Sequence, residues 1–483
     1  MSQPSDSLHI LLSKTLDHAL RYCGAEQDAP VAAPASYEEL MAQLRVPLSD
    51  KGVDAGIVID ELARAVDGGL HRTTGGRFYG WVIGGSMPSA LAADWLTSTW
   101  DQNSGAFAVA PAAQVAEEIA GEWLKEVLHL PQEASFALVT GCQMAHVTCL
   151  AAARHQLLRE RGYDVEQDGL FGAPAIRILT SSELHATVNR AARLLGFGER
   201  SIVALACDEE GRLPEATLRA ALEAQPDTPT IVLLQAGDVN TGTFDDFATL
   251  IPLAKQFHAW VHVDGAFGLW AAACPRVAHF TSGVEQADSW ATDGHKWLNV
   301  PYDCGYALVR HAEAHRAAFS QHASYVEQGA QARNSLDWNP EFSRRARGFT
   351  TYAALRELGR NGIADLVDRC CRHAHSIATR IGELPGAELL AEPRINQGLV
   401  RFLSPVTDID HDAFTDRVTA AILADGEALF SNTTWRGKRA MRISVSSWRT
   451  TAEDVDRTVQ SVAKVLAAAR QTALLSLATG RKL

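Results

Sequence analysis

The sequence predicts an α/β protein built around a mainly parallel sheet, and two observations carry this prediction. Between about residues 115 and 310, short apolar runs rich in β-branched residues alternate with segments of helical periodicity. Near-continuous apolar strands separated by helices are typical of a parallel sheet that is covered on both faces. The predicted strands are 136–140, 175–180, 201–207, 230–237 and 259–264.

The sequence on either side of this region predicts two further parts. Residues 35–44 and 53–68 carry apolar positions at helical spacing, and Ser36 is placed as a helix N-cap. After the predicted sheet, a long helical region, three or four strands and a closing helix from residue 451 predict a smaller α+β unit. The predicted parts are an N-terminal helical segment (1–75), a large ligand-binding domain (76–348) and a small C-terminal domain (349–483).

The composition argues against several classes of protein. The chain has 483 residues, of which 47% are hydrophobic and 21% charged, as in ordinary globular proteins. A net charge of −13 without a basic stripe argues against a nucleic-acid surface. No run approaches the roughly 18–20 apolar residues of a membrane span. The eight cysteines form no CxxC pair, which predicts reduced thiols and a cytoplasmic location.

Polar residues directly follow several of the predicted strands. Ligands of parallel α/β sheets bind at the carboxyl ends of the strands, so we expect these residues on one rim. The rim lacks a GxGxxG turn and a Walker motif, which argues against a nucleotide site. An acid, an imidazole and an amine suit pyridoxal phosphate, which needs a lysine for a Schiff base and an acid at its pyridine nitrogen. The residues are Thr140, His185, Asn240, Asp264, His295 and Lys296.

Each of these residues also has a simpler interpretation. Lys296 alone would be a surface lysine, but an apolar run follows it directly. Asp264 alone would be a capping residue, but it ends an apolar strand, where a lone charge is costly without a cation. His258, His262 and Asp264 together suggest a metal site. We predict no metal, because strand residues alternate faces and no softer third ligand is placed there.

Two motifs at this rim resemble those of the group II pyridoxal-phosphate-dependent decarboxylases, the family of aromatic amino acid, glutamate and histidine decarboxylases. HVDGAFG (262–268) is similar to the family's HVDAA, and DGHKWLNVPYDCG (293–305) to its NPHKW. The resemblance extends over about residues 70–450 and includes SSELHATVNRAARLLG, SRRARGF and MRISV in the same order. It implies the aminotransferase-like fold type I, with an N-terminal swapped helical segment and an obligate homodimer.

The resemblance implies a role for each rim residue. Lys296 would bind pyridoxal 5′-phosphate as a Schiff base, and Asp264 would pair with the pyridine nitrogen. His185 would stack on one face of the ring and contact the substrate carboxylate, while Ala266 would press on the other face. His295 would lie near the phosphate.

Other residues of the resemblance would complete the cofactor site. The turn Thr140–Gly141–Cys142 would offer the phosphate the N-terminus of a helix. The Asn240–Thr241 turn would line the cofactor. Two positions depart from the family pattern: the TGCQMA turn has fewer hydroxyl groups than the family's SGGSxA, and Asp293 replaces a common asparagine. Asp293 would therefore add negative charge near an anion.

The predicted reaction is the α-decarboxylation of an L-amino acid to its amine and CO2. Residues 320–338 resemble the family's mobile catalytic loop, in which Tyr325 would protonate the substrate carbon across the dimer interface. Relatives with phenylalanine there form aldehydes, so Tyr325 favours simple decarboxylation. The alternatives are another carbon–carbon lyase, an aldehyde synthase or an aminotransferase. A non-catalytic binding protein is disfavoured, because Lys296 and Asp264 are both intact.

The resemblance also indicates which loops would build the substrate pocket. Trp81 and Phe107 favour an apolar or aromatic substrate side chain. Gly84 and Gly105 stand where relatives have larger groups and predict extra room. The expected pocket residues are Tyr79, Trp81, Val82, Ile83, Phe107 and Arg442.

Overall fold

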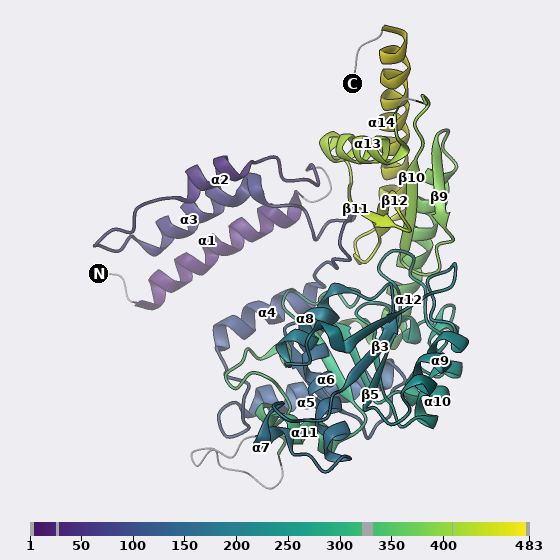
Figure 1. Ribbon diagram of the computed structural model, residues 1–483. Helices are drawn as coiled ribbons and strands as arrows, with labels where there is room; N and C mark the ends of the chain where they lie inside the picture. Colours follow the sequence, from purple (N-terminus) through teal and green to yellow (C-terminus); the bar gives the residue numbers. More distant parts are fainter. Residues whose placement is uncertain (1–3, 26–28, 321–331, 408, 480–483) are drawn as a thin grey trace.

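A computed structural model describes residues 4–25, 29–320, 332–407 and 409–479 (Figure 1). Its helices are α1 (Pro4–Gly24), α2 (Tyr37–Leu44), α3 (Ala55–Val66), α4 (Pro88–Trp100), α5 (Pro111–Val127), α6 (Cys142–Arg159), α7 (Val165–Asp168), α8 (Ala186–Leu194), α9 (Glu215–Ala224), α10 (Phe247–Gln256), α11 (Ala312–Phe319), α12 (Arg347–Gly382), α13 (His411–Asp425) and α14 (Ala452–Thr479). Its strands are β1 (Phe78–Tyr79), β2 (Ser135–Val139), β3 (Arg177–Ser181), β4 (Ile202–Leu205), β5 (Thr230–Gln235), β6 (Trp260–Asp264), β7 (Ser289–Asp293), β8 (Gly305–Val309), β9 (Ala387–Ala391), β10 (Gln397–Phe402), β11 (Leu429–Trp435) and β12 (Lys438–Ser444).

The larger sheet has seven strands in the order β2-β8-β7-β6-β5-β3-β4. The strands from β7 to β4 run parallel, whereas β8 is antiparallel to both β7 and β2. The five strands expected from the sequence are all present, and the prediction of a mainly parallel α/β sheet is confirmed. Strands β7 and β8 are not evident in the sequence, because they flank a polar motif and β7 (SWATD) is not a continuous apolar run.

Apolar side chains cover both faces of this sheet, which explains the continuous apolar runs. In β5, Ile231 and Leu233 pack into one cluster with residues of α6 and α8. Val232 and Leu234 point to the opposite face and join a second cluster with residues of α5, α10 and α12. Each β5 side chain is therefore buried whichever face it points to, as expected for a parallel sheet between helical layers.

The smaller sheet has the strand order β1-β11-β12-β10-β9. Four of its strands come from the predicted small domain, but β1 belongs to the predicted large domain and runs parallel to β11. Buried Arg77 stabilises the pairing of β1 with β11, because its guanidinium donates to the Glu427 carbonyl (2.9 Å) and to Asp454 (3.1 Å). The smaller sheet therefore includes one strand that the predicted boundaries assign to the large domain, and these boundaries remain predictions.

Helices α1–α3, drawn in purple in Figure 1, extend away from the two sheets. Ser36 caps α2 as expected, and Glu39 completes a capping box with it. Asp54 caps α3 through the amides of Gly56 and Ile57. Among the described residues, no helix is long and apolar enough to cross a membrane.

Candidate active site

A cavity of about 460 Å³ lies beside the carboxyl ends of the parallel strands. Many of the expected site residues line it: Trp81, Val82, Gly141, Cys142, His185, Asp264, Ala266, Asp293, His295, Lys296 and Arg442. Residues that the sequence did not single out also line it: Gln143, Thr187, Gln235, Gly237, Val239, Phe267, Ser431 and Asn432. Tyr325 lies outside the described residues, so its place relative to the cavity stays a prediction.

Lys296 follows β7 and extends its amine into the cavity. Its Nζ lies 3.1 Å from Oδ2 of Asp293, and its side chain is 20% exposed. Burial by itself would lower the pKa of this amine, but the charges of Asp293 and Asp264 raise the pKa above its ordinary value. The resting amine is therefore a cation, and it must lose a proton before it can act as a nucleophile.

Asp264 ends β6 and lines the same cavity. Its Oδ1 accepts the Ala266 amide (3.1 Å), and its Oδ2 lies 3.5 Å from Nε2 of His146. Burial by itself would raise the pKa of Asp264, but His146, His185 and Lys296 together hold the pKa well below its usual range. Asp264 is thus a buried anion in the cavity, as an acid that pairs with a protonated pyridine nitrogen must be.

His185 faces the cavity from the N-terminus of α8. Its Nδ1 accepts the Thr187 amide at 3.3 Å, which places the hydrogen of the neutral ring on Nε2. Burial lowers the pKa of His185, and the opposing charge of Asp264 only partly offsets this effect. A neutral, flat imidazole at this position suits the ring-stacking role that the resemblance implies.

Asp293 connects three groups at the end of the cavity near α6. Its Oδ1 accepts the Cys142 amide (2.6 Å) and lies 3.3 Å from Nε2 of His295, while its Oδ2 faces Lys296. His295 presents Nε2–H to Asp293, because its Nδ1 accepts the Cys304 amide (3.1 Å). The carboxylate of Asp293 therefore takes the first free amide of α6, where the family resemblance places the phosphate.

The remaining groups at this end still fit pyridoxal phosphate. The amides of Gln143 and Met144 are the next two of α6, and no partner is found for them among the described residues. Helix N-termini bind anions through such free amides. Gly141 is required here, because a Cβ at this position would lie 2.9 Å from Cε1 of His295. The cavity thus combines an amine, an acid and an anion site in the positions the cofactor needs.

Arg442 is a second cation at the cavity. It lies on β12, is 9% exposed, and its Nε has no hydrogen-bond partner among the described residues. Burial lowers its pKa, which nearby Asp238 partly offsets. A buried guanidinium with an unpaired N–H is costly unless a ligand completes it. Arg442 is therefore suited to bind an anionic group of a substrate.

The structure corrects several of the expected positions. Tyr79 is fully buried and pairs with Thr458 (3.1 Å), because β1 joins the smaller sheet and turns this side chain into the core. Ile83 packs beside the buried cluster of Val31, Phe78 and Leu429. Phe107 is 40% exposed and lies outside this cavity.

Two loops expected to contact the cofactor are also placed differently. Thr140 precedes α6 but does not line the cavity. Thr241 is buried, and the amides of Asn240 and Thr241 donate to Oδ1 of Asp238 at 2.9 and 2.8 Å. The 240–241 turn therefore stabilises its own loop, and its neighbours Gly237 and Val239 line the cavity instead.

Gly84 and Gly105 do not provide the extra room that the sequence suggested. A Cβ at Gly84 would lie 1.9 Å from the carbonyl oxygen of Lys296, and a Cβ at Gly105 would lie 2.8 Å from that of Phe342. Main chain, and not a substrate, fills both spaces. The loop of residues 81–85 is further fixed by the Gly85 amide, which donates to Oδ1 of Asn299 at 2.7 Å. Glycine at position 84 therefore sets how closely this loop approaches Lys296.

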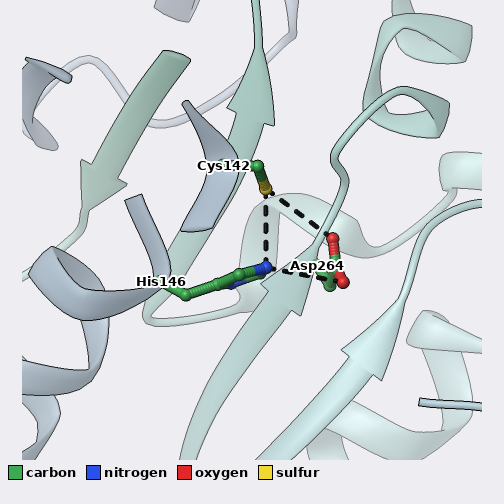
Figure 2. A group of neighbouring side chains, drawn as sticks. All are labelled: Cys142, His146 and Asp264. Carbon is green, nitrogen blue, oxygen red and sulfur yellow. Dashed lines mark hydrogen bonds and ion pairs between the residues drawn. The ribbon is translucent and has the colours of Figure 1, made fainter. Parts of the chain in front are cut away.

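Cys142, His146 and Asp264 form a buried cluster of metal-type ligands (Figure 2). Their ligand atoms lie within 4.8 Å of one another. The set of His258, His262 and Asp264 considered from the sequence is not the one that comes together. Each atom of the observed cluster already faces a hydrogen-bonding partner, so we interpret it as the surroundings of the Asp264 carboxylate.

We predict that Asp293→Asn lowers the pKa of Lys296, because the Asp293 carboxylate stabilises the charged amine. At neutral pH a larger fraction of the amine would then be uncharged, and it would react faster with pyridoxal 5′-phosphate. The measurement is the rate of cofactor capture by the cofactor-free protein as a function of pH. The midpoint of this pH dependence should lie at lower pH in the variant than in the unmodified protein.

The matched control for this variant is Asp303→Asn. Asp303 lies on the same segment as Asp293, but it pairs with Arg347 (2.9 Å). That variant should leave the midpoint in place. An identical midpoint in Asp293→Asn and the unmodified protein would show that Asp293 does not control the amine.

Comparison with known proteins agrees with this site. Residues 38–404 match the family described as the pyridoxal-dependent decarboxylase conserved domain. An aromatic-L-amino-acid decarboxylase of Bacillus atrophaeus is 24% identical over 92% of both chains. An L-2,4-diaminobutyrate decarboxylase of Rhizobium meliloti (strain 1021) is 27% identical over 77% of this chain and 74% of its own.

A crystal structure of Oryza sativa TDC with PLP and tryptamine superposes with a TM-score of 0.90. It is 22% identical, and the alignment covers 97% of this chain and 99% of that chain. The fold type I architecture and the pyridoxal phosphate cofactor expected from the sequence are thus confirmed. With the family match extending over most of its length, the chain belongs to the pyridoxal-dependent decarboxylases.

Proposed function

We propose that this decarboxylase removes the α-carboxyl group of an aromatic L-amino acid and releases the amine and CO2. The observation that carries the proposal is the joint placement of the Lys296 amine and the Asp264 carboxylate in one cavity with apolar walls. Trp81, Val82 and Phe267 supply those walls. Trp81 is 56% exposed, so its indole is available to a substrate side chain.

When bound, pyridoxal phosphate accepts the electron pair released as the bond between Cα and the carboxyl carbon breaks. The residues of the chain prepare this step. Lys296 would hold the cofactor, Asp264 would keep the pyridine nitrogen protonated, and His185 would cover the ring. Arg442 would bind the substrate carboxylate and orient the bond that breaks.

The charges of the cavity support an aromatic substrate over the two charged alternatives. Asp264 and Asp293 are the carboxylates among the described lining residues; Asp293 already faces the Lys296 amine, and Asp264 already faces His146. A substrate with a side-chain ammonium, such as 2,4-diaminobutyrate, would find no free acid there. An acidic side chain would compete with the α-carboxylate for Arg442, because Lys296 is needed for the cofactor.

Tyr325 remains our proposed donor of the proton that replaces CO2 on the substrate carbon. The support for it is the resemblance of residues 320–338 to the family's catalytic loop. The consequence is chemical: with a proton donor in place the product is an amine, whereas an aldehyde would indicate that protonation fails. Product identity therefore tests this assignment together with the reaction.

The test is a comparison of L-tryptophan, L-tyrosine, L-phenylalanine, L-2,4-diaminobutyrate and L-glutamate as substrates of the holoenzyme. CO2 and amine are both quantified, with Lys296→Ala as the background control. We expect the highest kcat/KM for one of the aromatic amino acids and one amine per CO2. A higher kcat/KM for diaminobutyrate or glutamate would refute the aromatic preference, and aldehyde in place of amine would refute the reaction.

We also propose that the protein is a homodimer in which α1 covers the partner subunit. The support is the apolar surface that this helix leaves exposed: Leu8, Ile10, Leu12, Leu16 and Leu20 are 43–63% exposed. A contiguous apolar face on a projecting helix is typical of a protein–protein interface. The free cysteines among the described residues are consistent with our proposed cytoplasmic location.

Ile10→Asp is expected to weaken this dimer, because it would bury a carboxylate in an apolar interface. Light scattering should give twice 52.2 kDa for the unmodified protein and a smaller mass for the variant at the same concentration. Gln167→Asp is the control, since it adds the same charge at an exposed polar position of α7, outside the proposed interface. A monomeric unmodified protein at micromolar concentration would refute the proposal.

A further inference from the structure

Behind Asp264 lies a chain of buried polar groups that the chemistry above does not use. His146 of α6 and His262 of β6 are both fully buried. Nδ1 of His146 lies 2.9 Å from Nε2 of His262, and Nδ1 of His262 lies 2.9 Å from Oγ of Ser289. Ser289 Oγ also accepts the indole N–H of Trp260 at 2.9 Å. Figure 2 shows the other end, where Nε2 of His146 faces Oδ2 of Asp264 at 3.5 Å.

Asp264 sets the direction of this chain, because a carboxylate can only accept; at the other end the Trp260 indole N–H donates a hydrogen bond to Ser289. Ser289 accepts that hydrogen bond and can direct its own hydrogen to Nδ1 of His262. His262 then donates through Nε2 to His146, and His146 donates through Nε2 to Asp264. Every donor in this arrangement has an acceptor, and both imidazoles are neutral with the hydrogen on Nε2.

An added proton would disrupt this arrangement. With a hydrogen on Nδ1 of His146, two N–H groups would oppose each other across the 2.9 Å contact with His262. To relieve this repulsion, the donor and acceptor roles in the hydrogen bonds from His262 to Ser289 would have to reverse. Burial also lowers the pKa of His262 to about 3, so this ring stays neutral. The geometry and the burial therefore favour the same protonation state.

The groups around Asp264 complete this picture. Oδ1 accepts the Ala266 amide at 3.1 Å and the Cys142 thiol at 3.8 Å. The thiol stays protonated, because burial and the nearby carboxylates raise the pKa of Cys142 well above its ordinary value. His185 and Lys296 face the carboxylate from across the cavity. Donors thus face both carboxylate oxygens of Asp264, and a proton on either oxygen would oppose one of them.

We infer that His146 and His262 are positioning residues, which hold Asp264 as an oriented anion against the pyridine nitrogen of the cofactor. This inference rests on the proposed function only in that it needs the cofactor to bind with its nitrogen at Asp264. Two buried imidazoles are expensive to place in a core unless each is fully hydrogen-bonded. Here the hydrogen bonds of both imidazoles lead to Asp264, the carboxylate that would keep the pyridine nitrogen of the cofactor protonated.

The first test uses the cofactor-free protein with 15N-labelled histidine. We expect two histidines that carry the hydrogen on Nε2, and the one assigned to His262 should not titrate between about pH 6 and pH 9, unlike an ordinary histidine. Their signals should disappear in His146→Gln and in His262→Gln, respectively. If either ring carries its hydrogen on Nδ1, or if the His262 signal titrates in this range, the neutral chain is refuted.

The second test uses cofactor labelled with 15N at the pyridine nitrogen. His146→Leu removes the donor to Asp264, so the pyridine nitrogen should lose its proton at lower pH than in the unmodified holoenzyme. kcat should fall about 10-fold with little change in KM, comparable to the loss of an outer hydrogen bond at other cofactor sites. His146→Gln should restore the signal, because an amide supplies one donor and one acceptor.

Two further variants separate a positioning role from a structural one. Ser289→Ala removes the hydroxyl group at the far end of the hydrogen-bonded chain. It should shift the pyridine signal in the same direction as His146→Leu, but to a smaller extent. His155→Leu alters a histidine of the same helix that pairs with Glu166 and should shift nothing. A folded His146→Leu with an unchanged pyridine signal would refute the inference, as would a His146→Gln that behaves like His146→Leu.

These signals do not depend on turnover. If none of the tested amino acids is decarboxylated while the pyridine signal still responds to His146 and Ser289, the proposed substrate fails and the positioning role stands. If turnover is normal while the signal does not respond, the positioning role fails and the proposed function stands.

Discussion

Lys296→Ala is expected to lower amine formation by about 10³-fold or more, because no other amine reaches the cavity from the described residues. The same variant should lose the visible absorbance band that appears when pyridoxal phosphate is bound covalently by a lysine. Retention of the cofactor after dialysis should also fall, since the phosphate and pyridine contacts would act alone. Steady-state kinetics and the visible spectrum measure these effects.

The control for this variant is Lys438→Ala, since Lys438 is an exposed lysine of β12 outside the cavity. It should keep both the activity and the visible band. An unchanged spectrum in Lys296→Ala would overturn the assignment of the cofactor lysine. Circular dichroism of both variants checks that the fold is intact.

Glu117→Gln is expected to destabilise the protein by about 3–5 kcal/mol, because it leaves a buried guanidinium without its counter-ion. Glu117 of α5 and Arg344 are both fully buried, with 2.6 Å between Oε2 and Nη1. Arg344 also donates to the Ser104 carbonyl (2.9 Å), and Ser335 donates to Oε1 of Glu117 (2.9 Å). The pair therefore ties the segment around residues 335 and 344 to α5.

Urea denaturation measures this effect as a change in the free energy of unfolding. Glu126→Gln is the matched control, because Glu126 pairs with Arg360 at 2.6 Å but both side chains are exposed. Exposed pairs contribute roughly 0–1 kcal/mol, so this variant should differ little from the unmodified protein. Equal losses in the two variants would contradict a special role for the buried pair. Glu117→Leu combined with Arg344→Met should recover part of the loss.

Patterns of short range predict much of this structure. The apolar runs locate the strands, because a strand buried on both faces must be apolar throughout. Asp264 could be placed on the rim because it ends a predicted strand, whereas Lys296 was assigned through the resemblance of its motif to that of the family. The capping box at Ser36 is likewise written in adjacent residues. Each of these features depends on residues within one element or its immediate neighbour.

Features that depend on how distant elements meet could not be predicted in this way. Tyr79 turns into the core because two residues of β1 pair with β11, about 350 positions later, and no local pattern encodes that pairing. In the sequence, His146 looks like an ordinary residue of a helix that contains both apolar and polar side chains. The available signal was its place one turn after Cys142 at the start of α6, which brings it beside the Asp264 carboxylate.

The close approach at Gly84 also limits how this enzyme can diversify. A random library over residues 81–85 would sample position 84 to no purpose, since any side chain there meets the Lys296 carbonyl within 1.9 Å. Trp81, Val239 and Phe267 line the same cavity through side chains, so substitutions there change its wall. A new substrate preference can therefore evolve through these three positions. Gly84 is constrained instead, because it contacts the main chain of Lys296, the residue that would bind the cofactor.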